Sequence, residues 1–83
     1  MRLEDRVIMV ILENSEGLDG MTVDSDLRNF GIDSFGSLMI ANGLEAEFGI
    51  EISDLHTNRI TSVKEIVSLL KTFYSVEETY EFI

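Results

Sequence analysis

A serine at the start of a predicted helix is the residue of this chain best suited to chemistry. It lies in the stretch GIDSFGSLMI, directly after Asp33. Gly31 permits backbone conformations that other residues resist, and the Asp33 carboxylate can cap the helix. Ser34 is then not needed as the cap, so its hydroxyl can face solvent beside the unpaired N–H groups and the positive dipole end of the helix.

A phosphate ester on the Ser34 oxygen would be stabilised at such a helix end. The site therefore suits a phosphorylated or phosphopantetheinylated serine. The alternative left open is an ordinary helix-start serine, which is common at such positions.

The other reactive side chains argue against an enzyme. Ser34, Ser37 and His56 are the candidates for a nucleophile and a base, but no motif supplies an oxyanion hole, and a domain this small leaves little interior for a pocket. His56 lies in the polar stretch LHTNR and is interpreted as a solvated surface residue. The chain has no cysteine, which removes disulfides, thiolate nucleophiles and cysteine-based metal sites. We predict no catalytic residue.

One stretch, DSDLRNFGIDSF, begins like a calcium-binding loop. An EF-hand needs a ligand at its fifth position, glycine at its sixth and glutamate at its twelfth. Here these positions hold Arg28, Asn29 and Phe35. We predict no metal site, and we interpret Asp24 and Asp26 as turn formers and caps.

Length and charge restrict the class of protein further. The chain has 83 residues, which suffice for one small domain, and a net charge of −10 from sixteen acidic and six basic residues. That charge repels nucleic acids and favours basic patches on other proteins, unless it serves solubility alone. The longest apolar run, Val7 to Leu12, is too short to cross a bilayer, and no signal peptide is identified. We expect a monomer in the cytoplasm without membrane insertion.

Helical periodicity predicts the elements that position the serine. Long helices are expected at residues 2–15, from Asp33 or Ser34 to about Phe48, and at 62–74, with a short helical turn at 53–57. Gly49 suits the C-terminal end of the second helix, and Ser62 with Glu65 forms a capping box at the start of the last one. Residues 17–33 form a long connection, which we expect to be pinned down and functional. The predicted fold is all-α: a small four-helix bundle, three long helices and one short, with a long loop between helices one and two.

Apolar stripes on these helices define the expected core. Its members are Leu3, Val7, Val10, Ile11, Ile40, Ala41, Leu44, Phe48, Val63, Ile66, Val67, Leu70 and Phe73, with Leu27, Phe30 and Ile32 as anchors in the long loop. Residues 1–74 are expected to form the domain and residues 75–83 an acidic C-terminal tail. The apolar residues of that tail lack a clear period, so deletion after Ser75 is expected to cost little stability.

The triplet Asp33, Ser34, Phe35 resembles the Asp-Ser-Leu-like triplet of acyl carrier proteins. The surrounding FGIDSFGSLMIANGLEAEFGIEISD is similar to the loop and second helix of that family, and RITSVKEIVSLL is similar to the opening of its last helix. The resemblance covers nearly the whole chain up to Tyr74.

The resemblance implies a carrier that bears 4′-phosphopantetheine. A phosphopantetheinyl transferase would move this group from coenzyme A to Ser34, beside Asp33, in a magnesium-dependent reaction. The arm ends in a thiol that holds acyl or aminoacyl groups as thioesters. The implied partners are this transferase, an acyl- or aminoacyl-loading ligase, and synthase or transferase enzymes with basic docking surfaces.

The resemblance also suggests a docking surface on the second helix. Phe35, Leu38 and Met39 are apolar residues that the core stripe does not need, and Glu45 and Glu47 supply acidic charge nearby. Apolar patches bordered by charge tend to be interaction sites. The alternative is that the three are ordinary, partly exposed hydrophobic residues.

Some positions depart from the pattern of fatty-acid carriers. Met39 and Ala46 stand where such carriers usually have acids, Gly36 replaces a usual aspartate, and Asn42 replaces a usual apolar residue. A serine followed by a bulky residue and glycine is similar to D-alanyl and other aminoacyl carriers. Fatty-acid-like, polyketide and other specialised biosynthesis all remain open. The rival from another class is an unmodified acidic helical adaptor that binds partners through the second helix.

Overall fold

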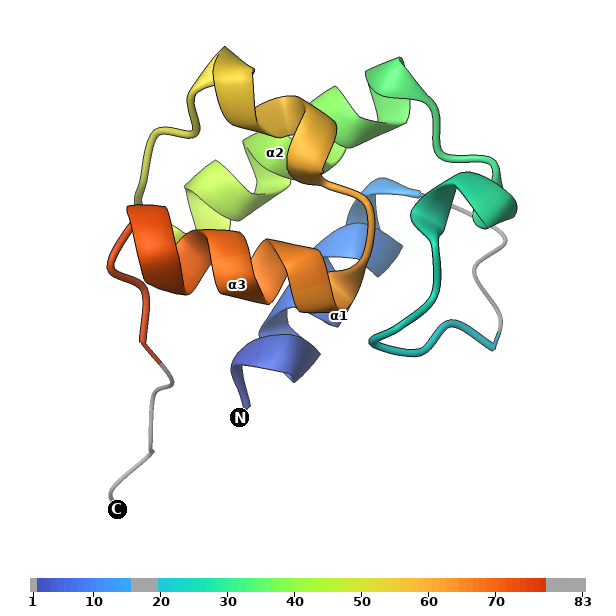
Figure 1. Ribbon diagram of the computed structural model, residues 1–83, viewed down its shortest axis with the longest axis horizontal. Coiled ribbons are helices and arrows are strands. Elements are labelled where there is room, and N and C mark those ends of the chain that lie inside the picture. Colours follow the sequence, from blue (N-terminus) through green and yellow to red (C-terminus); the bar gives the residue numbers. More distant parts are fainter. Residues whose placement is uncertain (1, 16–19, 78–83) are drawn as a thin grey trace.

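The chain folds into a bundle of helices. The computed structural model describes residues 2–15 and 20–77, and within these ranges it contains no strand. Its elements, in chain order, are α1 (Leu3–Asn14), η1 (Leu27–Phe30), α2 (Ser34–Phe48), η2 (Asp54–Arg59) and α3 (Val63–Phe73) (Figure 1). The predicted all-α bundle of three long helices and one short one is confirmed. The short helix is η2, a 3₁₀ helix, and the 3₁₀ helix η1 within the long loop was not predicted.

The ends of α2 follow the predicted local chemistry. The Asp33 carboxylate accepts a hydrogen bond from the Gly36 N–H at 2.9 Å, which caps the first turn. Gly49 ends the helix with φ at 66°, a left-handed conformation in which glycine carries no steric cost. Its N–H donates to the Glu45 carbonyl oxygen. Both boundaries of α2 are therefore encoded by single residues at its two ends.

The core lies where α1 packs against α2 and α3. Every buried side chain in the described part of the chain is apolar. The buried residues are Leu3, Val7, Val10, Ile11, Leu27, Ile32, Ile40, Ala41, Leu44, Ile52, Ile60, Val63, Ile66, Val67, Leu69 and Leu70. The predicted stripes are confirmed for all members except two: Phe48 is half-buried, and Phe73 is 52% exposed.

Phe73 was wrongly predicted to be a core residue because it shares the period of the α3 stripe. It lies in the last turn of α3. The centroid of its ring is 4.8 Å from the centroid of the His56 ring and 5.4 Å from the guanidinium carbon of Arg59. Leu69, one turn earlier, is fully buried and was not predicted. The apolar face of α3 is therefore broader than a single stripe.

The long loop is pinned to the bundle, as predicted. Leu27 and Ile32 are buried, and Phe30 packs against the core. The Leu27 N–H donates to the Thr61 carbonyl oxygen at 2.8 Å, and the Lys64 N–H donates to the Val23 carbonyl oxygen at 3.0 Å. These bonds connect the loop to the start of α3. In Figure 1 this contact lies on the right, and the C-terminal end of α3 lies on the left. Residues 17–19 of the predicted loop lie outside the described residues.

After α3 the chain stays on the bundle for a short distance. Val76 is half-buried against the core, and its N–H donates to the Leu70 carbonyl oxygen at 3.0 Å. The apolar tail residues Tyr80, Phe82 and Ile83 lie outside the described residues. The domain boundary after residue 74 and the small cost of deleting the tail stay predictions.

Candidate functional site

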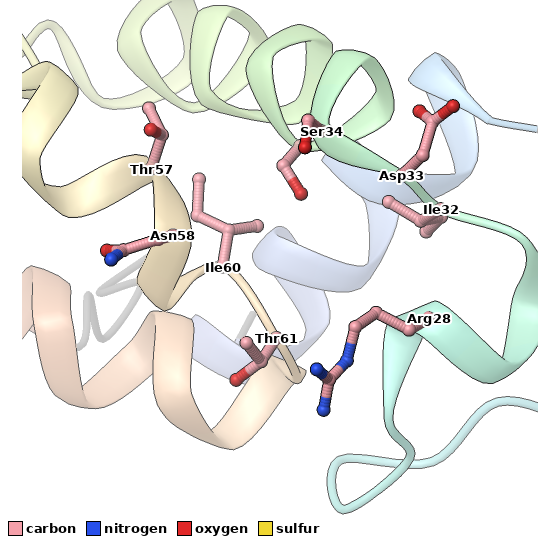
Figure 2. A pocket seen from close by; sticks show the side chains of 9 residues that line it. Arg28, Ile32, Asp33, Ser34, Thr57, Asn58, Ile60 and Thr61 are labelled. Atoms are coloured by element: carbon pink, nitrogen blue, oxygen red, sulfur yellow. The ribbon is translucent and has the colours of Figure 1, made fainter.

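Ser34 is the first residue of α2, and its side chain is exposed. Asp33 occupies the cap position, as the Gly36 N–H bond shows, so the serine is not used to start the helix. Within residues 2–15 and 20–77, no group forms a hydrogen bond with the Ser34 hydroxyl. Figure 2 shows this hydroxyl pointing toward a cleft, while the Asp33 carboxylate points away from it. The serine oxygen is therefore open to an incoming reagent.

The cleft beside Ser34 has a volume of about 380 Å³. It is formed where the end of the long loop, the first turn of α2, η2 and the link to α3 meet (Figure 2). Its lining residues are Arg28, Ile32, Asp33, Ser34, Ser37, Thr57, Asn58, Ile60 and Thr61. Ile32 and Ile60 are buried and form an apolar floor, while hydroxyl and amide side chains line the walls. This cleft lies between surface elements and takes no volume from the core, so it does not conflict with the expectation that so small a domain has little interior for a pocket.

Arg28 brings a guanidinium group, paired with Asp26, to the edge of this cleft. The Asp26 carboxylate accepts hydrogen bonds from the Arg28 backbone N–H at 2.9 Å, from Nε at 3.1 Å and from Nη2 at 2.9 Å. The hydrogen bond from the Arg28 side chain is the main cause that lowers the pKa of Asp26, and the same bond raises the pKa of Arg28. Asp26 caps η1, as the sequence suggested, and it also orients the guanidinium.

The apolar residues of the predicted docking surface lie together on α2. Phe35, Leu38 and Met39 have the spacing i, i+3, i+4, which places them on one side of a helix, and all three are exposed, Phe35 by 69%. They begin one residue after Ser34. The structure thus brings an exposed apolar patch next to the candidate attachment residue.

The two predicted acidic docking residues lie in the second half of α2 and have partners within the chain. The Glu45 carboxylate is half-buried and accepts a hydrogen bond from the Ile52 N–H at 2.7 Å. Glu47 is exposed, and its Oε2 lies 3.1 Å from Arg6 Nε. Glu45 thus has a structural contact that sequence reasoning missed, because no local pattern links a helix residue to a backbone N–H seven positions later.

His56 is not a solvated surface residue, contrary to the prediction. It is half-buried, and its Nδ1 lies 2.6 Å from the Tyr74 hydroxyl, which also accepts a hydrogen bond from the Ser53 N–H at 2.9 Å. His56 is absent from the lining of the Ser34 cleft. The hypothetical set of Ser34, Ser37 and His56 is therefore not assembled.

Two further properties concern the described part of the chain alone. No three His, Cys, Asp or Glu side chains within residues 2–15 and 20–77 come together in a way that could hold a metal ion. In the same ranges, no helix has the length and apolar character needed to cross a membrane.

Comparison with known proteins identifies the class to which this site belongs. The family model described as a phosphopantetheine attachment site matches residues 6–70. The acyl carrier protein of Rickettsia bellii (strain RML369-C) is 31% identical over 71 residues, which cover 83% of each chain. The mitochondrial acyl carrier protein of Dictyostelium discoideum is 38% identical over 71 residues, 83% of this chain and 58% of that one.

A third relative, acyl carrier protein 2 of Pseudomonas aeruginosa, is 42% identical over 50 residues, 59% of this chain and 63% of that one. No solved structure gives a significant match. With a family match that spans most of its length, the chain belongs to the acyl carrier protein family. It is a carrier that bears phosphopantetheine and is not an enzyme, as the sequence predicted.

Proposed function

We propose that Ser34 is the residue to which 4′-phosphopantetheine is attached. The observation that carries this proposal is the exposed Ser34 hydroxyl, left free because Asp33 takes over the cap of α2. A phosphodiester on this oxygen would lie at the N-terminal end of a fifteen-residue helix, where free N–H groups and the helix dipole favour negative charge. Arg28 adds a cation at the edge of the same cleft.

The residues around Ser34 fit the chemistry of the arm. Phosphopantetheine carries a phosphate, a hydroxyl and amide groups, and the cleft offers a guanidinium, hydroxyls and an amide over an apolar floor. Ser34 would hold the group through its ester bond, and the walls of the cleft would exchange hydrogen bonds with the arm. When attached, the arm supplies the thiol that the chain itself lacks.

The cargo is an acyl or aminoacyl group, and the pathway is a fatty-acid-like, polyketide or other specialised biosynthesis in the cytoplasm. Partners would include the phosphopantetheinyl transferase, a loading ligase, and synthases or transferases with basic docking surfaces. They would meet the apolar patch of Phe35, Leu38 and Met39, with Glu45 and Glu47 as acidic border. Support for this surface comes from the exposure of the three apolar side chains beside Ser34.

Intact mass spectrometry tests the attachment. The chain is incubated with coenzyme A, Mg²⁺ and a broad-specificity phosphopantetheinyl transferase, and its mass is expected to rise by one arm. Ser34→Ala should abolish the gain. Ser37→Ala is the matched control, because Ser37 lines the same cleft one turn later, and it should load normally. No gain of mass with several transferases would contradict the proposal and favour an unmodified adaptor.

A substitution that introduces a negative charge tests the docking surface. Met39→Glu places an acid in the exposed apolar patch, so it should leave the thermal midpoint nearly unchanged while it alters turnover by the loading enzyme. Thr72→Glu adds the same charge to an exposed position of α3 and serves as the control. Unfolding of the Met39→Glu protein, or equal turnover of both variants, would count against docking at this patch.

A further inference from the structure

The middle of helix α1 is apolar on all of its sides, between charged residues in its first and last turns. Residues Val7 to Leu12 are six consecutive apolar residues, and in a helix of 3.6 residues per turn they point in every direction. Val7, Val10 and Ile11 are buried in the core, but Met9 is 48% exposed and Leu12 is 51% exposed. A helix on the surface of a bundle normally carries polar residues on its outer side. The outer side of α1 thus departs from this pattern.

The exposed side of α1 is distinct from the side that contacts α2. Val10 and Asn14 lie closest to Gly43 of α2, and Arg6 pairs with Glu47 of α2. Met9 and Leu12 are offset from these residues around the helix, since each residue turns by about 100°. We call the surface formed by Asp5, Met9, Leu12 and Glu13 the outer α1 face; all four side chains are exposed.

The outer α1 face has an apolar centre bordered by the acids Asp5 and Glu13, while Arg6, three residues before Met9, is paired with Glu47 of α2. Met9 and Leu12 are three residues apart and therefore neighbours on the helix, while Asp5 precedes Met9 by one turn and Glu13 follows Leu12. An apolar patch bordered by charge has the anatomy of a protein interface, with an apolar centre and a polar rim.

We propose that the outer α1 face is a second docking surface, for a protein partner that presents an apolar surface bordered by lysine or arginine. Charge complementarity selects this occupant: two acids border the patch, and the chain carries a net charge of −10. A second copy of the chain would bring Asp5 and Glu13 of both molecules together around the two-fold axis and would add the repulsion of two acidic domains. A partner held on α1 would leave the start of α2 open to the enzymes that use Ser34.

Methyl NMR tests the proposal, because methionines report on both surfaces: Met9 on α1 and Met39 on α2. The probe is a short helical peptide with leucines along one side and lysines on the others. It is titrated into the full chain labelled at the methionine methyl groups. We expect the Met9 methyl signal to shift in a saturable manner, with an affinity that falls as salt is added.

Two matched variants separate the surfaces. Leu12→Gln should weaken the peptide affinity measured from the Met9 signal about fivefold, as expected when the exposed half of a leucine side chain is no longer buried against the apolar side of the peptide. The affinity measured from the Met39 signal should stay unchanged. Leu38→Gln should do the reverse. Both variants replace exposed residues, and both should keep the helical circular dichroism of the parent.

Three results would overturn the proposal. The Met9 signal could stay constant while Met39 shifts, which would confine docking to α2. Sedimentation could show a dimer of the free chain that Leu12→Gln dissociates, which would make a second copy the occupant. The Met9 methyl in the free chain could show nuclear Overhauser contacts to another segment, which would mean that the chain covers this face itself. Loading of Ser34 is independent of all three results, so a failure here leaves the proposed function intact.

Discussion

The two ends of helix α2 are held in different ways. At the C-terminal end, the Glu45 carboxylate binds the Ile52 N–H, Arg6 pairs with Glu47, and the Arg6 guanidinium carbon lies 4.4 Å from the centre of the Phe48 ring. At the N-terminal end, the Asp33 cap and the buried Ile32 are the contacts that fix the first turn in the described structure. Beyond them, Ser34 and Phe35 are exposed.

This difference separates stability from chemistry within one helix. The C-terminal half fixes α2 to α1 and to the connector before η2, so the helix has a defined position. At the N-terminal end, the side chains of Ser34 and Phe35 are exposed and form no hydrogen bond or ion pair with the described residues, so a group can be attached to Ser34 without breaking such a bond. Substitutions in the C-terminal half should therefore lower stability, and substitutions at the N-terminal end should act on loading and docking.

The largest effect is expected from Leu44→Ala. Leu44 is fully buried in the C-terminal half of α2, and such truncations lower the free energy of unfolding by about 2–5 kcal/mol through lost burial and a residual cavity. Urea denaturation measures the change, with exposed Leu38→Ala as the control. If the two variants lost equal stability, the contrast between the ends of α2 would be wrong.

A smaller effect is expected at Glu45, where two substitutions separate its roles. Glu45→Ala removes the acceptor of the Ile52 N–H and should cost about 1–2 kcal/mol. Glu45→Gln keeps an oxygen acceptor but removes the charge, so it should cost clearly less. Thermal melts compare both. Glu45→Gln then tests the charge of this residue in docking without loss of the fold, and equal stability of all three proteins would show that the bond to Ile52 contributes nothing.

Asp33→Ala should have an effect on stability of about 1 kcal/mol, the usual cost of losing a helix cap. Asp33→Asn keeps an acceptor for the Gly36 N–H and should retain most of that stability. The measurement is the denaturation midpoint of each variant. A loss well above that of Glu45→Ala would mean that the N-terminal end of α2 is held as firmly as the other end.

The smallest effect concerns the Asp26–Arg28 pair at the edge of the Ser34 cleft. Because the bound Arg28 lowers the pKa of Asp26, the pair contributes to stability above the ordinary pKa of aspartate, and this contribution is lost as the pH falls through the lowered pKa. Carboxyl NMR titration should show the low pKa of Asp26 in the parent and a higher one in Arg28→Gln, where only the bond from the backbone N–H of residue 28 still lowers it. An unchanged pKa in that variant would mean that Arg28 is not oriented by Asp26.

Features that depend on neighbouring residues, such as helix ends and buried helix faces, could be predicted from the sequence. The cap at Asp33, the glycine stop at Gly49 and the stripe of Ile40, Ala41 and Leu44 are local patterns, and each is confirmed. The buried loop anchors Leu27 and Ile32 were also predictable, since isolated apolar residues in a long polar connection need a place to pack.

Contacts between distant segments could not be predicted in this way. His56 meets Tyr74 across 18 residues, and Tyr74 meets Ser53 across 21, so the surroundings of His56 depend on how η2 lies against α3. The cleft beside Ser34 forms where four segments meet, so no local sequence pattern indicates its presence or its volume. The candidate attachment residue Ser34 could be found from the sequence because the residues that indicate it, such as the capping Asp33, are its neighbours in the chain.

Fragmentation of the loaded chain tests the central claim most directly. After reaction with coenzyme A and a phosphopantetheinyl transferase, the protein is digested and the modified peptide is sequenced by tandem mass spectrometry. We predict that the whole added mass lies on Ser34, with Ser37 unmodified. An arm on any other residue would contradict the account.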